Sequence, residues 1–247
     1  MTVLSVNVNK IALLRNSRGR DYPNLNDYVE QIVGLGVAGI TVHPRPDQRH
    51  ITRSDVYKLA ELLKAHPEVE FNIEGYPSND FLELVLEVQP AQCTLVPDLP
   101  GQLTSDHGWN VDKSETLLSA VLTRLRNKGI RSSLFLDPDV ESVDKVAGVG
   151  ADRIELYTEK FASEFGSVNE ETCFQSYVNT AERATELGIG LNAGHDLDLE
   201  NLPKFLTIPG VQEVSIGHAL VVESLQLGLV NVVNRYLDIC SNAASIQ

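Results

Sequence analysis

Cysteine, basic residues and long apolar runs are all scarce in this 247-residue sequence. The three cysteines, Cys93, Cys173 and Cys240, are widely spaced and form no C-x-x-C pair, which is typical of a reduced, cytoplasmic protein. Twenty Lys and Arg against 34 Asp and Glu give a net charge of −14, which argues against a nucleic-acid backbone or an anionic membrane as partner. No apolar run reaches the roughly 18 residues that span a bilayer, and the first residues lack signal-peptide features. We therefore expect a cytoplasmic location.

Short apolar segments are the feature that the sequence does have in abundance. They lie at 2–9, 38–43, 70–74, 93–97, 132–137, 152–157, 189–195 and 212–218. Stretches with helical periodicity follow them, at 25–35, 53–65, 78–88, 113–128, 140–148, 170–187, 199–206 and 219–239. This alternation of strand and helix is typical of a parallel α/β fold, and eight units predict a closed (β/α)8 barrel. No linker or change of composition divides the chain, so we expect one domain over residues 1–247.

Polar residues alternate with apolar ones inside several predicted strands. The polar positions are Ser5, Asn7 and Asn9; Thr41 and His43; Asn72 and Glu74; and Arg153, Glu155 and Tyr157. Because successive side chains of a strand point to opposite faces, one set faces the helices and the other lies inside the barrel. Buried polar groups cost free energy unless they are hydrogen-bonded or handle a ligand. The pattern predicts a polar interior beneath a ligand site.

Ionisable residues gather at the carboxyl ends of the predicted strands, where barrels of this class carry their chemistry. These positions hold Asn7, His43, Glu74, Asp137, Glu155, His195 and His218. Glu74 and Glu155 are candidate general acids or bases, because a carboxyl group withdrawn from water has a raised pKa. The alternative for both is a structural ion pair with Arg18, Arg45 or Arg153.

A loop dense in cationic and titratable groups follows the second predicted strand. In His43-Pro-Arg-Pro-Asp-Gln-Arg-His50, Arg45 and Arg49 offer planar donor groups suited to phosphate or carboxylate, and the two prolines restrict the backbone. The loop predicts an anion site. The alternative is a surface loop held by salt bridges.

Two further segments have features that are suited to binding anions. Lys10, Arg15, Arg18 and Arg20 form a basic cluster after the first strand, for which a solvated helix face is the alternative. Strands seven and eight end in Gly194-His195 and Gly217-His218, and a helical segment follows Gly217 at once. Backbone N–H groups at such a helix start bind anions, and phosphate sites of this barrel class commonly lie after strands seven and eight.

A divalent metal is an alternative ligand for the same rim. His43, Glu74, Glu155, His195 and His218 could supply ligands from several strands, which would fit a metal-dependent isomerase or hydrolase. No H-x-H or H-E-x-x-H pair is present, so the sequence does not favour this alternative.

Taken in order, the strand-end motifs resemble those of the pyridoxine 5′-phosphate synthase family of vitamin B6 biosynthesis. They read VNVNKIALLRNSRG, GITVHPRPDQRHI, FNIEGYPS, LVPD with Thr104, RIELYTE, GIGLNAGH and VSIGHAL, and they span essentially the whole chain. The resemblance implies a (β/α)8 barrel with a few extra helices, assembled as a homo-octamer and free of metal or organic cofactor. It also implies an enzyme that condenses 3-amino-2-oxopropyl phosphate with 1-deoxy-D-xylulose 5-phosphate to give pyridoxine 5′-phosphate, inorganic phosphate and water.

The resemblance assigns a role to each matching residue. His43 and Glu74 match proton acceptors, His195 matches a proton donor, and Glu155 matches a supporting acidic residue. The matches to contacts with the aminoketone phosphate are Asn7, Arg18, Gly217 and His218. The matches to contacts with the xylulose phosphate are Arg45, His50 and Thr104.

Three positions depart from the common family pattern. Asn9 and Lys10 replace an Asp-His pair that contacts the sugar phosphate; the amide can bind a hydroxyl and the ammonium can attract phosphate. This replacement leaves open a catalytically silent barrel that binds a phosphorylated metabolite. Asp196 stands where a glycine backbone meets phosphate. Because its carboxylate would repel phosphate, we expect it to turn outward and cap the next helix.

Overall fold

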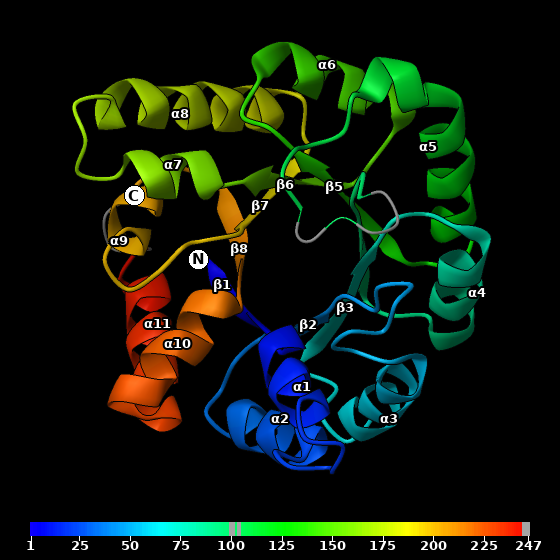
Figure 1. Ribbon diagram of the computed structural model, residues 1–247. Helices are drawn as coiled ribbons and strands as arrows, with labels where there is room; N and C mark the ends of the chain where they lie inside the picture. The colour runs from blue at the N-terminus through cyan, green and yellow to red at the C-terminus, as the bar shows by residue number, and fades with distance from the viewer. Residues whose placement is uncertain (99–101, 103–104, 244–247) are drawn as a thin grey trace.

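The computed structural model describes residues 1–98, 102 and 105–243. Eight parallel strands close into a barrel in chain order, from β1 to β8, and helices surround it (Figure 1). The strands are β1 (Val3–Asn7), β2 (Gly39–Val42), β3 (Glu70–Gly75), β4 (Gln92–Leu95), β5 (Arg131–Leu136), β6 (Arg153–Tyr157), β7 (Gly190–Gly194) and β8 (Val211–Ile216). Each overlaps one predicted apolar segment, and the predicted (β/α)8 barrel is confirmed.

The described residues form eleven helices. They are α1 (Asn9–Asn16), α2 (Leu25–Val33), α3 (Arg53–Leu63), α4 (Asn79–Val88), α5 (Val111–Arg126), α6 (Val140–Val149), α7 (Glu159–Glu164), α8 (Glu170–Glu186), α9 (Leu202–Phe205), α10 (His218–Leu227) and α11 (Leu229–Ala243). Helices α1 and α7 were not predicted. The single helix predicted over 219–239 is two helices, which separate at Gly228 with a φ of 83°.

Local signals in the sequence explain where several helices begin. The Thr52 hydroxyl accepts from the Asp55 N–H while the Asp55 carboxylate accepts from the Thr52 N–H, which completes the capping box before α3. The Ser78 side chain accepts from the Phe81 N–H at the start of α4. These two caps fix where the chain leaves the loops after β2 and β3.

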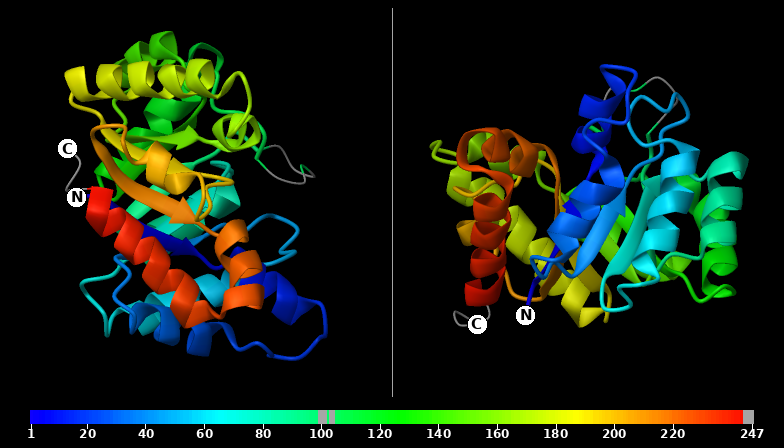
Figure 2. Two further views of the ribbon diagram at one scale, coloured as in Figure 1. Left: turned by 90° about the vertical axis from the view of Figure 1, so that its left-hand side faces the viewer. Right: turned by 90° about the horizontal axis from the view of Figure 1, so that it is seen from below.

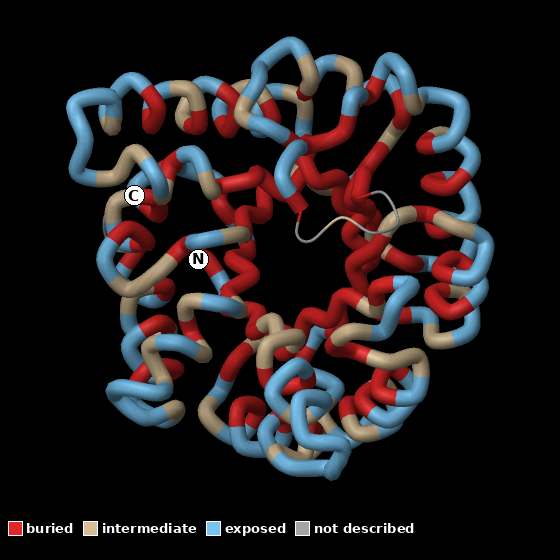
Figure 3. Tube along the Cα trace, viewed as in Figure 1, coloured by how far each residue is buried: buried red, intermediate tan, exposed pale blue. Residues whose placement is uncertain are grey.

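The barrel wall is buried on both sides, and the outer sides of the helices are exposed (Figure 3). The last helix, α11, packs against β1 and runs along the outside of the barrel (Figure 2). Within the described ranges, no helix combines the length and apolar character that a bilayer crossing needs.

Inside the barrel, polar side chains from neighbouring strands bond to one another. The Ser5 and Thr41 hydroxyls lie 2.7 Å apart, and the Asn72 amide donates to Thr41 at 3.3 Å. The Thr94 hydroxyl lies 3.2 Å from Asn72 Oδ1 and 3.3 Å from Glu155 Oε2. This chain of contacts reduces the cost of burying polar groups and confirms the predicted polar interior. It leads from β1 across the barrel to a carboxyl group at the predicted site.

Candidate active site

A histidine and a carboxyl group meet at the carboxyl ends of β2 and β3. His43 Nδ1 lies 4.0 Å from Glu74 Oε2, and both side chains are buried. The Asn7 amide donates to the same Glu74 oxygen at 3.4 Å. Three strand-end residues predicted from sequence are therefore brought together.

Burial pushes the pKa values of this pair in opposite directions. Burial lowers the pKa of His43 well below its usual value, and the positive charge of Arg45 lowers it further. Burial raises the pKa of Glu74 well above its usual value, and the charge of Glu155 adds to the effect. Both shifts favour the uncharged forms, a neutral imidazole beside a protonated carboxyl group.

Glu155 on β6 is a second buried carboxyl group. Burial, followed by the negative charge of Glu213, raises its pKa to about 8. Its Oε1 packs so close to β7 that a Cβ at Gly194 would lie 2.6 Å from it. A glycine is needed at position 194 because Glu155 occupies the space of a side chain.

The loop after β2 is held by one buried and one exposed ion pair. Arg45 Nη2 donates to Asp98 Oδ2 at 2.6 Å, and Nη1 donates to the Gln102 carbonyl at 3.0 Å. Arg49 Nε donates to Asp47 Oδ2 at 2.8 Å. Salt bridges do hold this loop, as the alternative interpretation stated. The loop nevertheless borders a pocket of about 550 Å³, lined in part by His43, Arg45, Arg49, Arg53, Tyr76 and Asp98.

His50 at the end of this loop presents a neutral ring. Its Nδ1 accepts from the Ile51 N–H at 2.9 Å, so in the neutral ring the proton resides on Nε2. Burial lowers its pKa to about 4, and the charges of Arg45, Arg49 and Lys10 contribute. Lys10 therefore lies within electrostatic reach of His50.

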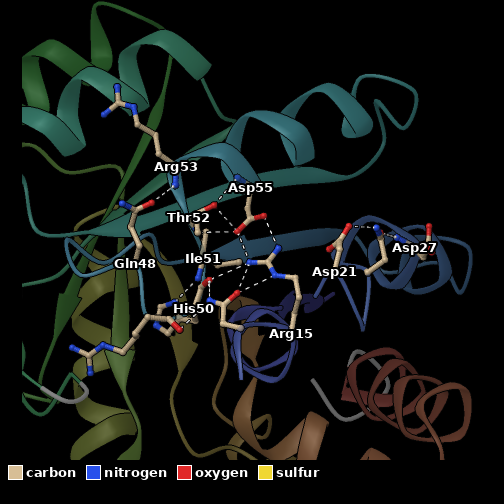
Figure 4. Close-up of polar contacts among 12 residues, drawn as sticks. Arg15, Asp21, Asp27, Gln48, His50, Ile51, Thr52, Arg53 and Asp55 are labelled. Atoms are coloured by element: carbon tan, nitrogen blue, oxygen red, sulfur yellow. Dashed lines mark hydrogen bonds and ion pairs between the residues drawn. The ribbon is translucent and has the colours of Figure 1, made fainter. Parts of the chain in front are cut away.

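The basic residues after β1 lie in two different environments. Arg15 donates to both oxygens of Asp55, at 2.6 and 2.8 Å, and to the His50 carbonyl at 3.4 Å (Figure 4). Arg15 thus anchors the loop after β2 to α1 and α3 through its own ion pair. Arg18 and Arg20 are exposed in the segment after α1.

The Asn9 side chain, which the sequence predicts at the sugar-phosphate site, contacts the backbone of His43. Its Oδ1 accepts from the His43 N–H at 2.9 Å, and its own N–H donates to Asn7 Oδ1 at 3.0 Å. Asn9 is therefore a support for His43. The sequence did not reveal this contact because α1, which begins at Asn9, was not predicted.

Asp196 does not cap the next helix, and this prediction was wrong. Its Oδ2 lies 2.9 Å from Nδ1 of His195. The turn before α9 is held instead by Asp198, whose Oδ1 accepts from the Glu200 and Asn201 N–H groups at 2.9 and 2.8 Å. The hydrogen bond with His195 is the first cause that lowers the pKa of Asp196, and the charges of His218 and Lys10 also contribute.

Gly217 and His218 form the junction between β8 and α10, as expected. Gly217 is the N-cap residue and His218 the first residue of α10. A Cβ at Gly217 would lie 2.9 Å from Asn7 Cβ and 3.1 Å from the Asn7 carbonyl oxygen. The close approach places the start of α10 beside the end of β1, where its N–H groups can face an anion.

Some predictions lie outside this geometry, and some site residues were missed. Thr104 lies outside the described residues. Among the residues that are described, no cluster of three or more His, Cys, Asp or Glu side chains is arranged to hold a metal ion.

Asp98 received no role from the sequence, although its position in the segment after β4 is the signal that nominated the other strand-end residues. Trp109 is buried and donates to the Leu95 carbonyl at 2.8 Å.

The fold and these residues define a (β/α)8 barrel with buried histidine and carboxyl groups at the carboxyl ends of its strands. Residues 4–242 match the family model described as pyridoxal phosphate biosynthesis protein PdxJ. A pyridoxine 5′-phosphate synthase of Bacteroides thetaiotaomicron is 52% identical over 96% of this chain and 98% of its own. One of Flavobacterium johnsoniae is 51% identical over the same shares. The chain therefore belongs to the PdxJ family, and it is an enzyme of vitamin B6 biosynthesis.

Solved structures agree on the architecture alone. The phosphoribosylanthranilate isomerase of Thermotoga maritima superposes with a TM-score of 0.63 at 12% identity. The match covers 98% of this chain and 100% of that one. At this identity the likeness supports the barrel fold and carries no statement about the reaction.

Proposed function

We propose that His43, Glu74 and His195 perform the proton transfers of pyridoxine 5′-phosphate synthesis in this chain. The reaction joins 3-amino-2-oxopropyl phosphate to 1-deoxy-D-xylulose 5-phosphate and releases inorganic phosphate and water. Attack of an amine on a ketone, loss of water, elimination of phosphate and ring closure each move protons, so several titratable groups around one cavity are required. The observation that carries the proposal is the buried His43–Glu74 pair, 4.0 Å apart at the strand ends.

The electrostatics of the pair suggest an order of events. His43 is neutral and can accept a proton directly, because its pKa is lowered by burial and neighbouring cations. Glu74 starts protonated, because its pKa is raised by burial and by Glu155. Glu74 therefore acts as an acceptor only after its own proton has passed on. His195 is proposed as the donor, with Glu155 as the supporting acid.

Two anion sites are proposed for the two phosphates. Asn7, Arg18, Gly217, His218 and the backbone at Asp196 would hold the aminoketone phosphate. Arg45, His50, Asn9, Lys10 and Thr104 would hold the xylulose phosphate. Lys10 is close enough to lower the pKa values of both His50 and Asp196, which supports its position between the two sites.

The proposal extends to assembly and location. One catalytic domain over residues 1–247 would act in the cytoplasm as a homo-octamer, without metal or organic cofactor. An exposed apolar groove supports assembly; it is lined by Ile11, Leu14, Pro23, Tyr28, Val221, Ser224, Leu225 and Leu229. Leu225 at its edge is 76% exposed, which is costly for a large apolar side chain unless another surface covers it.

The deciding experiment is a direct assay with purified protein. Incubation with both phosphorylated substrates should produce the pyridinol chromophore together with inorganic phosphate, and omission of either substrate should abolish both signals. A relative from Bacteroides thetaiotaomicron serves as the positive control. Absence of product under conditions in which that relative is active contradicts the proposed reaction.

A further inference from the structure

Asp196 stands next to the proposed proton donor in sequence and turns back onto its ring. The His195 Nδ1 to Asp196 Oδ2 distance is 2.9 Å, within hydrogen-bond range. The His195 side chain is about one quarter exposed and that of Asp196 about two fifths. The side chains of adjacent residues usually point away from each other. The contact between His195 and Asp196 therefore depends on the backbone conformation at these two residues.

The backbone is bent and fixed at both residues. His195 has a φ of 90° and Asp196 a φ of 58°, a left-handed region that non-glycine residues seldom occupy. The hydroxyl of Thr158, which is fully buried, donates to the Gly194 carbonyl at 2.8 Å and also to the His195 carbonyl. The Asn201 amide donates to the Asp196 carbonyl at 3.1 Å. Protein contacts on both sides thus maintain the turn that brings the carboxylate to the imidazole.

Two aromatic side chains also pack against the imidazole ring of His195. The ring of Tyr157 meets His195 edge-on at 5.0 Å between centroids, and Phe135 does so at 6.5 Å. Tyr157 and Phe135 also contact each other at 5.2 Å. The carboxylate and the aromatic pair together restrict the orientation of the ring.

We propose that Asp196 is a positioning residue that accepts the Nδ1–H of His195, so that the ring, once doubly protonated, donates to the substrate from Nε2 and is left with its remaining proton on Nδ1. Which ring nitrogen carries the proton is set by the hydrogen bond that the other nitrogen makes. In many active sites the side chain that acts as acid or base is oriented by a hydrogen bond to a further group. The inference rests on the role proposed for His195, but the contact itself can be tested without catalysis.

Two other roles for Asp196 are weaker. Helix capping does not fit, because the N-cap residue of α9 is Asn201 and the turn before it is bonded by the side chain of Asp198. A contact of the carboxylate with substrate phosphate would set like charges against each other, whereas its hydrogen bond to His195 at 2.9 Å lies within the protein and lowers its pKa. The side chain is thus balanced by protein groups and directed at His195.

Glycine is the informative substitution. Asp196→Gly removes the carboxylate at a φ that glycine adopts without strain, so the variant should fold. Asp196→Asn keeps an oxygen that can accept from Nδ1–H but loses the charge. In nitrogen-15 NMR spectra of substrate-free protein, wild type and Asp196→Asn should show His195 protonated at Nδ1. Asp196→Gly should shift the proton toward Nε2.

Steady-state kinetics distinguish the positioning of His195 by Asp196 from a simple repulsion between Asp196 and the substrate phosphate. General acid–base groups contribute about 10²- to 10⁴-fold, so losing the orientation should lower kcat of Asp196→Gly about 10- to 100-fold, with Asp196→Asn between it and wild type. KM for the aminoketone phosphate should stay the same or fall. An unchanged kcat with a lower KM would show that Asp196 only repels substrate, and would overturn the inference.

The control is a surface pair of the same type. His66 Nε2 lies 3.1 Å from Glu30 Oε2, far from the strand ends, so Glu30→Gln should alter the His66 signal and leave kcat unchanged. If His195 shows the same tautomer in wild type and Asp196→Gly, the inference is wrong whatever the kinetics. If wild type makes no product, the proposed reaction fails, and the NMR comparison still decides the contact.

Discussion

At the scale of single residues, burial rather than residue type decides the chemistry of the site. His43 and Glu74 are ordinary titratable groups in sequence, yet their pKa values move in opposite directions once both are buried together. Such separation of pKa values is how one site provides an acid and a base at the same pH. The sequence could nominate both residues but could not tell which of them would start with the proton.

The first prediction concerns His43. His43→Gln removes the group that accepts a proton while keeping a polar side chain of similar size. We expect kcat to fall about 100-fold or more, in line with general base catalysis, and both KM values to change little. Steady-state kinetics with each substrate varied in turn provide the measurement.

His66→Gln is the matched control, because His66 is a partly exposed residue paired with Glu30. It should retain the kinetic constants of wild type. Equal losses in the two variants would indicate a general effect of removing histidine and would remove His43 from the mechanism.

At the scale of elements, the strands were predictable and the loops were not. Short apolar segments identify the eight strands, and period-two alternation supports β1, β2, β3 and β6, because one face must meet the helices and the other the interior. Helix α1 escaped prediction because Asn9–Asn16 is short, and its basic residues resemble a charged loop. The contacts of Arg45 with Asp98 and of His195 with Asp196 depend on loop conformations, including two positive φ values, that no periodicity encodes.

The second prediction concerns the junction of β8 and α10. Gly217→Ala would place a Cβ 2.9 Å from Asn7 Cβ, and the neighbouring backbone carbonyl leaves it little room. We expect the junction to shift, with a loss of about 1–3 kcal/mol in the free energy of unfolding. KM for the aminoketone phosphate should rise more than KM for the xylulose phosphate. Urea unfolding and steady-state kinetics measure the two effects.

Gly148→Ala in α6 is the control for this substitution. Nothing lies within 4 Å of the added Cβ there. Alanine in a helix is favoured over glycine by about 0.5–1 kcal/mol, so this variant should be as stable as wild type or more so, with normal kinetics. Wild-type behaviour of Gly217→Ala would show that the close approach to Asn7 is not needed.

At the scale of the whole molecule, the buried carboxyl groups tie stability to pH. Burial raises the pKa values of Glu74, Glu155 and Glu213 in the folded protein. At pH values above the usual carboxyl pKa, the folded state therefore binds more protons than the unfolded state. Stability falls as pH rises through this window, which for Glu155 extends to about 8. Asp55, whose pKa is lowered, acts in the opposite sense and loses its contribution in acid.

The third prediction follows from this linkage. Glu155→Gln removes one group whose folded pKa lies near 8, so the free energy of unfolding should decline less steeply between pH 5 and pH 8 than in wild type. Urea unfolding at a series of pH values gives the slope. An unchanged slope would mean that Glu155 is ionised throughout this range in the folded protein.

The fourth prediction concerns assembly. Light scattering should give eight times the chain mass of 27.2 kDa for the wild type. Leu225→Lys places a charge in the apolar groove and should lower that mass. Leu117→Lys, at a 37% exposed leucine of α5, should not. If both variants keep the wild-type mass, the groove is not a subunit interface.

If Arg45 holds a substrate phosphate as proposed, its ion pair with Asp98 should make the site discriminate among anions. An incoming monovalent ion such as chloride offers Arg45 no more charge than the carboxylate 2.6 Å away already supplies. A phosphate ester carries about two negative charges at neutral pH and three acceptor oxygens, so it can compete where chloride cannot. With the role proposed for Arg45, this cation stays available for doubly charged metabolites.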